Sequence, residues 1–201
     1  MKAMSLRKLV DMQREPNPLA LVDCPVPEPG PGELRIKVSV CGVCHTELDE
    51  IEGRTPPRQL PVIPGHQVVG RIDKVGPHVD DRLLGERVGV AWLNSACGQC
   101  KWCRTERENL CPDFCATGRD VDGGYAEYML APSAFVHPIP EVFTDAEAAP
   151  LLCAGAVGYR SIRLACLQSG APLGLTGFGL SLIHISEPTR QYCQSRMPSS
   201  A

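Results

Sequence analysis

The sequence predicts a mainly β domain followed by the truncated start of an α/β domain. Apolar and polar residues alternate with a period of two over residues 33–40, which is typical of a strand with one buried face. Further strand-like runs follow at 68–75, 85–90 and 125–130. After Thr144 the apolar residues recur at helical spacing. The change of periodicity indicates a domain boundary near that residue.

Length, charge and cysteine content limit the class of protein. The 201 residues suffice for one large domain, or one and a half smaller ones, with a buried core. With 20 Lys and Arg against 23 Asp and Glu, the net charge of -3 provides no basic field for nucleic acid or an anionic membrane surface. No apolar run approaches the ~18 residues of a membrane-spanning helix. The 11 cysteines, without a signal sequence in residues 1–10, favour the reducing cytoplasm over a secreted disulfide scaffold.

The first strand of the predicted core leads into a cysteine motif. Residues 19–32 are rich in proline, which predicts edge strand and turn rather than helix. Residues 33–40 then place four apolar side chains on one buried face: Leu34, Ile36, Val38 and Val40. Cys41 and Cys44 follow where this strand ends. Alone, this C-x-x-C fits a pair of buried thiols as well as a redox or metal site.

Four cysteines spaced C-x2-C-x2-C-x7-C predict a structural zinc site. Gaps of two residues let successive sulfurs turn back onto one tetrahedral Zn²⁺, and the ligands are Cys97, Cys100, Cys103 and Cys111. Gly98 permits the tight turn between the first two. Disulfides are the alternative, although three thiols within seven residues are poorly placed to pair with one another. Cys115 is the nearest competing ligand.

Residues 144–179 predict two helices and a strand. Thr144 and Glu147 form a capping box, so a short helix is expected to about Ala149, and a second from about Gly155 to Leu167. Pro150 interrupts what would otherwise be one helix. A short apolar strand over 171–176 then ends in two glycines, Gly177 and Gly179, at the opening of a dinucleotide-binding turn.

Five segments occur in the order found in zinc-dependent medium-chain alcohol dehydrogenases, which this sequence resembles from residue 1 to about 179. The segments are CGVCHTEL, PGHQVVGRI, the four-cysteine lobe, PLLCAGAVGY and LTGFG. The resemblance implies a mainly β GroES-like catalytic domain, then the truncated start of an α/β Rossmann domain. It also implies a catalytic zinc held by Cys44, His66 and Cys153. A lone histidine such as His66 is otherwise more often structural, and the resemblance favours the ligand role.

The resemblance implies hydride transfer between an alcohol and NAD or NADP, with aldehyde or ketone as product. Zinc acts as the Lewis acid, and two Zn²⁺ are expected per chain. Thr46 matches the hydroxyl that takes the alcohol proton, and His45 matches a residue that approaches the cofactor pyrophosphate. Gly177 and Gly179 match glycines of the nucleotide turn. Small-molecule alcohols or aldehydes are the expected partners, with no nucleic acid or membrane, and the full-length protein is expected to be a homo-oligomer.

Three positions depart from the family pattern. Gln67 replaces the acid that usually follows the zinc-binding histidine, which removes a charge beside the metal. Asp49 replaces a histidine of the proton relay in many members, and Val157 replaces a threonine near the nicotinamide. Asp49 leaves open the last step by which the proton reaches solvent.

The resemblance divides the chain into 1–143, the GroES-like zinc-binding domain, and 144–179, the start of the nucleotide-binding domain. Residues 180–201 are interpreted as an artefactual segment, because 180–190 resembles the translation of a sequencing adapter, and Leu182 stands where a small residue is needed. A disordered tail is the alternative. We expect the chain as given to be inactive alone, although its full-length parent is an enzyme. A non-catalytic zinc-binding β-domain is the competing function. The sequence leaves open the alcohol, the choice of NAD or NADP, and the oligomeric state.

Overall fold

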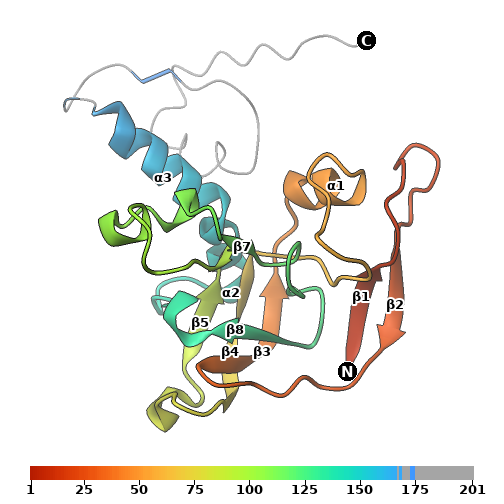
Figure 1. Cartoon of the computed structure of the whole chain (residues 1–201), viewed down its shortest axis with the longest axis horizontal. Helices are drawn as coiled ribbons and strands as arrows, with labels where there is room; N and C mark the ends of the chain where they lie inside the picture. The colour runs from red at the N-terminus through yellow and green to blue at the C-terminus, as the bar shows by residue number, and fades with distance from the viewer. Residues whose placement is uncertain (167, 169–172, 175–201) are drawn as a thin grey trace.

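The computed structural model describes residues 1–166, 168 and 173–174. Seventeen helices and strands follow one another in this part of the chain (Figure 1): β1 Lys2–Leu6, β2 Leu19–Asp23, β3 Glu33–Cys41, α1 His45–Ile51, β4 Val68–Val75, η1 Asp81–Leu83, β5 Arg87–Val90, β6 Leu93–Ser95, η2 Cys103–Thr105, η3 Glu108–Leu110, β7 Cys115–Ala116, β8 Tyr128–Pro132, η4 Ser133–Phe135, β9 Val136–Pro138, α2 Asp145–Ala148, η5 Ala149–Leu152 and α3 Ala154–Ala165. Among them, no helix is both long enough and apolar enough to cross a membrane.

A five-stranded antiparallel sheet in the order β8-β3-β4-β5-β9 carries the main core. The alternation predicted for β3 places Leu34 and Ile36 fully inside this core, where they pack with Val68, Ile72 and Met129. Burying each such side chain contributes about 1.5–3 kcal/mol. β1 pairs with β2, and β6 pairs with β7, in two smaller sheets. The prediction of a mainly β domain is therefore confirmed.

The end of β3 differs from the prediction. The pairing of β3 with β4 shifts between Val38 and Val40, and such a bulge changes which side of the strand a residue faces. Val38 packs against the main core, whereas Val40 packs against a second cluster made by Val69 and Ala148. The expectation that Val40 shares one face with Leu34 is therefore wrong. The bulge lies just before the cysteine motif and helps to direct it.

The strand expected over 125–130 begins later, at Tyr128. The preceding backbone N–H groups bind the loop that ends at Gly65: Gly123 donates to the carbonyl of Ile63 at 2.6 Å, and Gly124 donates to the carbonyl of Gly65 at 2.8 Å. A Cβ on Gly123 would lie 2.1 Å from the Gly65 oxygen, so only glycine permits this approach. These contacts fix the loop that carries His66.

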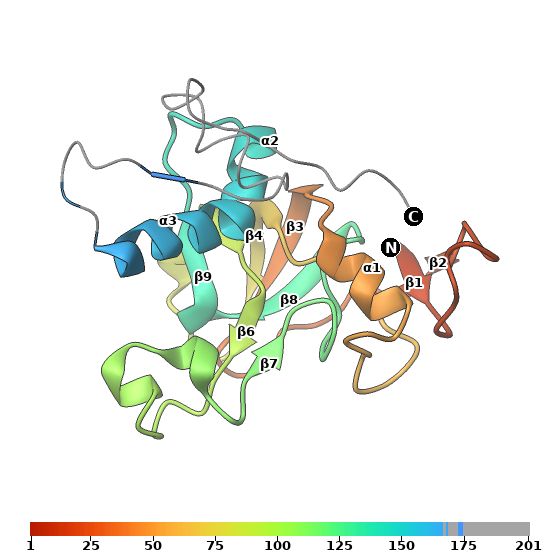
Figure 2. The same cartoon turned by 90° about the horizontal axis from the view of Figure 1, so that it is seen from above.

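The helices after Thr144 agree with the sequence prediction. The Thr144 hydroxyl accepts from the Glu147 N–H, and the Glu147 carboxylate accepts from the Thr144 N–H at 2.9 Å, which completes the capping box. The first helix ends at Ala148, and Pro150 lies in a 3-10 turn before α3. Ala148 packs on β4, which brings the start of α3 to the end of the sheet where α1 begins (Figure 2). Two parts of the chain that are far apart in sequence thus meet.

Candidate active site and metal centres

Cys44, His66 and Cys153 come together at one end of the five-stranded sheet. Their ligand atoms all lie within 4.8 Å of one another, and the two sulfurs are 3.9 Å apart. Each residue lies just before a helix or strand. Cys44 is the N-cap of α1, Cys153 is the N-cap of α3, and His66 lies two residues before β4. The structure therefore brings together the three residues that the resemblance suggested as catalytic zinc ligands.

The sheet register explains how Cys44 and His66 meet. β3 and β4 pair antiparallel as far as Cys41 and Val68, so the segments beyond these residues leave the sheet at the same end. Gly65 adopts a φ of +101°, a conformation that favours glycine, and turns the chain toward the site. A Cβ there would also lie 2.8 Å from the Cys41 sulfur. Cys41 therefore packs behind the site, and burial raises the pKa of its thiol to about 12.

Glu47 holds the imidazole of His66, and the sequence analysis did not identify it. His66 is only 1% exposed, and its Nδ1 lies 2.6 Å from Oε1 of Glu47, itself 3% exposed. The other oxygen of Glu47 accepts from the Cys44 N–H at 2.8 Å. The signal in the sequence was a glutamate three residues after the N-cap, which completes a second capping box. One carboxylate thus links two of the three candidate ligands.

The charges in this site favour cation binding. A hydrogen bond with Cys153, and then the neighbouring His66 imidazole, lower the pKa of the Cys44 thiol to about 3. The same contact with Cys44 raises the pKa of Cys153. Burial lowers the pKa of His66, but the neighbouring Cys44 sulfur and the Glu47 carboxylate raise it more, to about 9. Two sulfurs and an imidazole in negative surroundings form the donor set that Zn²⁺ prefers.

The imidazole is also oriented for a metal. Glu47 contacts Nδ1, while Nε2 is buried and makes no hydrogen bond to any described residue. A carboxylate on one ring nitrogen is the usual arrangement when the other nitrogen is a ligand. Cys44 and Cys153 are free thiols, so both sulfurs are available. The residues present therefore fit a zinc ion with three protein ligands.

The two other candidate residues on α1 lie beside this site. Thr46 Oγ1 is 3.5 Å from the Cys44 sulfur and is partly accessible. His45 is exposed, and its Nε2 lies 3.7 Å from Oδ1 of Asp49. Asp49 also pairs with Arg54. Thr46 therefore faces the metal group, whereas His45 lies on the outer side of the helix. Gly177 and Gly179, with the strand expected over 171–176, lie outside the described residues.

The positions that depart from the family pattern differ in burial. Gln67 is 1% exposed, and neither atom of its side-chain amide has a hydrogen-bond partner among the described residues. Its side chain lies against Gly42, where a Cβ would come within 3.1 Å of Gln67 Oε1. Val157 lies on α3 with its side chain exposed. The neutral Gln67 thus occupies a buried position next to His66.

The four-cysteine lobe forms a second metal-ligand group. The sulfurs of Cys97, Cys100, Cys103 and Cys111 all lie within 4.8 Å of one another. Cys103 Sγ is 3.9 Å from Cys97 Sγ and 3.6 Å from Cys100 Sγ, and Gly98 takes a φ of +70° in the turn. N–H groups of Gln99 and Cys100 lower the pKa of Cys97 to about 7, which favours the thiolate. Cys115 pairs in β7 and is not a member of the group. All ten described cysteines are free, so the alternative of disulfides within the lobe is wrong.

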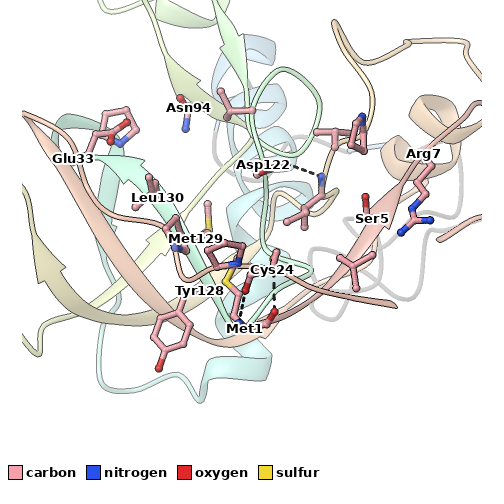
Figure 3. A pocket seen from close by; sticks show the side chains of 18 residues that line it. Met1, Ser5, Arg7, Cys24, Glu33, Asn94, Asp122, Tyr128, Met129 and Leu130 are labelled. Carbon is pink, nitrogen blue, oxygen red and sulfur yellow. Dashed lines mark hydrogen bonds between the residues drawn. The ribbon is translucent and has the colours of Figure 1, made fainter. Parts of the chain in front are cut away.

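A separate cavity of about 540 Å³ lies between β1, β2 and β8 (Figure 3). Asp122 closes one side by accepting from the Ile63 N–H at 2.8 Å, and Met129 contributes an apolar wall. None of the candidate metal ligands lines this cavity. The cavity is thus distinct from the metal-ligand groups.

Comparison with known proteins gives the class of the chain. Residues 30–141 match the family described as the alcohol dehydrogenase GroES-like domain. This chain belongs to that family, and its relatives place it among the zinc-dependent medium-chain alcohol dehydrogenases. The predicted GroES-like fold class and the family resemblance are confirmed.

Individual relatives and structures show how far the similarity extends. The "Probable alcohol dehydrogenase AdhA" of Mycobacterium tuberculosis is 50% identical over 167 residues, covering 81% of this chain and 48% of the relative. An alcohol dehydrogenase of Geobacillus stearothermophilus is 43% identical over 156 residues, covering 77% and 46%. The cobalt- and zinc-bound thermostable alcohol dehydrogenase of Pyrobaculum aerophilum matches with a TM-score of 0.83 and 25% identity, over 97% of this chain and 58% of that one. The chain spans about half the length of the curated relatives that it matches.

Proposed function

We propose that this chain is the zinc-binding catalytic portion of an alcohol dehydrogenase that transfers hydride between an alcohol and NAD or NADP. The convergence of Cys44, His66 and Cys153 from three separate segments is the observation that carries the proposal. A zinc ion bound there supplies Lewis-acid stabilisation of the substrate oxygen. Relatives support the cofactor, since one similar structure is complexed with NADH and another is bound to NADP.

The residues of the chain divide the work of the site. Cys44 and Cys153 contribute thiolates, and Glu47 holds the ring of His66 with Nε2 toward the metal group. The Thr46 hydroxyl, next to Cys44, accepts the proton of the alcohol at Oγ1. His45 and the glycines Gly177 and Gly179 are assigned to the cofactor phosphates by family resemblance. The four cysteines of the lobe hold a structural zinc.

The domain assignment belongs to the same proposal. Residues 1–143 form the catalytic domain, 144–179 begin the nucleotide-binding domain, and 180–201 have no assigned function and lie outside the described residues. The substrates are small alcohols and aldehydes, and the whole enzyme is a homo-oligomer. The ten cysteines in the described part of the chain are free, which fits a reducing cytoplasm.

Zinc content tests the metal assignment directly. The purified chain should hold two Zn²⁺, and Cys44→Ser should hold one. If wild type and Cys44→Ser contain the same number of ions, the catalytic site is assigned to the wrong residues. Calorimetric titration with NAD and NADP should show no tight binding to the 201-residue chain, because Leu182 stands where the glycine-rich nucleotide turn needs a small residue. Micromolar affinity would show that this segment forms a cofactor site.

A zinc-binding module without catalysis is the second candidate function, and it is favoured by the chain matching only half of its relatives. A chimera distinguishes the two. The chain through Ala165 is joined to the remaining part of the Mycobacterium tuberculosis relative, and alcohol oxidation is followed by NADH absorbance. Turnover that Cys44→Ser abolishes supports the enzyme. A folded chimera that holds two zinc ions and oxidises no alcohol supports the module.

A further inference from the structure

Buried polar atoms without hydrogen bonds are concentrated at one place in the described residues. Eight such side-chain atoms occur, and all belong to five residues: Glu47, Glu50, His66, Gln67 and Trp92. Each unsatisfied buried group costs roughly 1–3 kcal/mol. Glu47 Oε1 and His66 Nδ1 face each other at 2.6 Å without hydrogen-bond geometry, and both residues belong to the candidate metal site already described. Glu50, which the proposed mechanism does not use, is the most costly of the others because it is an acid with both oxygens unsatisfied.

Glu50 shares the inner face of α1 with Glu47. The two residues are three apart in a helix, so their side chains lie on the same side, and Glu50 is 1% exposed. Burial, and then the charge of Glu47, raise the pKa of Glu50 to about 7, while the charge of His66 acts in the opposite direction. The Glu50 carboxyl therefore lies within electrostatic reach of the imidazole that faces the metal group.

Trp92 and Arg119 are the other groups that act on this carboxyl. Trp92 Nε1 lies close enough to Glu50 to lower its pKa, although the contact does not have hydrogen-bond geometry. The Arg119 guanidinium stacks 5.4 Å from the Trp92 ring and donates to the buried Asp120 at 2.8 Å. Arg119 is thus fixed by Asp120 and acts on Glu50 only through its charge.

We propose that Glu50 is a positioning residue of the Cys44, His66 and Cys153 site, acting through Glu47. This inference rests on the proposed function. Glu47 touches His66, and Glu50 lies on the same face of α1, where its ionised carboxylate adds negative potential at the imidazole; a cation bound at the site favours that ionised form. Negative potential strengthens the binding of a divalent cation by the neutral ring. Since Gln67 carries no charge, Glu50 is the second acid that serves this site.

The substitution Glu50→Gln tests the role with almost no change of shape. Removing a residue that supports a metal ligand costs 10–100-fold in metal affinity, so the Zn²⁺ affinity of the Cys44, His66 and Cys153 site should fall by roughly 10–100-fold. Affinity is measured on the 201-residue chain by competition with a chromophoric zinc chelator, with the ions counted by native mass spectrometry. Glu50→Asp, which keeps the charge, should recover most of the affinity.

Two measurements separate this role from a structural one. Replacing an unpaired buried acid by an amide removes a desolvation cost, so the melting temperature of the metal-free Glu50→Gln chain should stay equal or rise. In a Cys44→Ser background the effect of Glu50→Gln on zinc affinity should disappear. Glu52→Gln is the matched control, because Glu52 is the C-cap residue of the same helix and pairs with Arg54. This substitution should leave the zinc affinity unchanged.

The outcomes distinguish this inference from the proposed function. A wild-type chain that binds only the zinc of the four-cysteine lobe refutes the proposed function, and this inference with it. A wild-type chain with two zinc ions, and Glu50→Gln of equal affinity, refutes this inference alone. Lower stability of Glu50→Gln without a change of zinc affinity also refutes it, because a structural role would then be sufficient.

Discussion

Glu47→Gln should be far more costly than the same substitution in the other capping box of the chain. Glu47 uses both of its oxygens: Oε1 contacts His66 Nδ1 at 2.6 Å, and Oε2 accepts from the Cys44 N–H at 2.8 Å. An amide has one acceptor oxygen, so it can keep only one of the two interactions. Each of the two contacts is buried and involves a charged group, so losing one costs about 1.5–3 kcal/mol.

Glu147 is the matched control because it serves a capping box alone. One oxygen, Oε2, accepts both from the Thr144 N–H at 2.9 Å and from the Thr144 hydroxyl at 2.7 Å. The amide oxygen of Glu147→Gln can take its place, so the expected change is within about 0.5 kcal/mol. The two substitutions thus remove the same charge from the same position of two helices.

Urea unfolding of the zinc-loaded chain measures the difference. The free energy of unfolding in water is extrapolated for wild type and both variants, and chelator competition gives the zinc affinity of each. For Glu47→Gln, the loss of unfolding free energy of the zinc-loaded chain, which includes any loss of zinc binding, should be about 1.5–3 kcal/mol. For Glu147→Gln it should be almost nothing. Equal losses in the two variants would show that Glu47 is only a helix cap, and its role at His66 would have to be withdrawn.

Three further predictions concern the lobe, the sheet and the start of α2. Replacing Cys97 and Cys103 together by serine should reduce the zinc content from two ions to one and lower the melting temperature; two remaining ions would contradict the partition of ligands. Hydrogen bonding from the Ser39 hydroxyl, and then the interaction with Arg87, lower the pKa of Asp145. The stability that Asp145 contributes is therefore present at neutral pH and is lost as the pH falls through its folded-state pKa. The difference in unfolding free energy between wild type and Asp145→Asn should therefore vanish in acid, and a difference that grows in acid would be incompatible with this sign. Gly70→Ala should lower the free energy of unfolding by about 1–3 kcal/mol or more, because the added Cβ would lie 2.3 Å from the backbone oxygen of Lys37 on β3. An unchanged free energy of unfolding would mean that the two strands are not paired in this register.

Local patterns were sufficient for several parts of this protein. The spacing of Cys97, Cys100, Cys103 and Cys111 brings four sulfurs together within one loop, because a short chain that turns at Gly98 has few other ways to place them. The capping box at Thr144 was equally accessible, since donor and acceptor lie three residues apart. The alternation in β3 also located Leu34 and Ile36 in the core, because every second side chain of a strand lies on the same face.

Contacts across the chain required the tertiary structure. The family resemblance named Cys44, His66 and Cys153, but the residues alone could not, because Cys44 and Cys153 are 109 positions apart and meet only through sheet pairing and the packing of α2 on β4. The bulge that turns Val40 away from the core likewise depends on the register of β4.

The burial of acids was the feature that sequence reasoning missed. Helical spacing places Glu47 and Glu50 on one face of α1, and an acidic face in a short helix ordinarily faces solvent. In this fold the face turns inward onto His66 and Trp92. Sequence determined the kind of candidate metal ligands that this chain carries and how the lobe gathers four of them. Only the tertiary structure decided which acids lie near His66, because burial depends on what packs against a side chain and not on its own spacing.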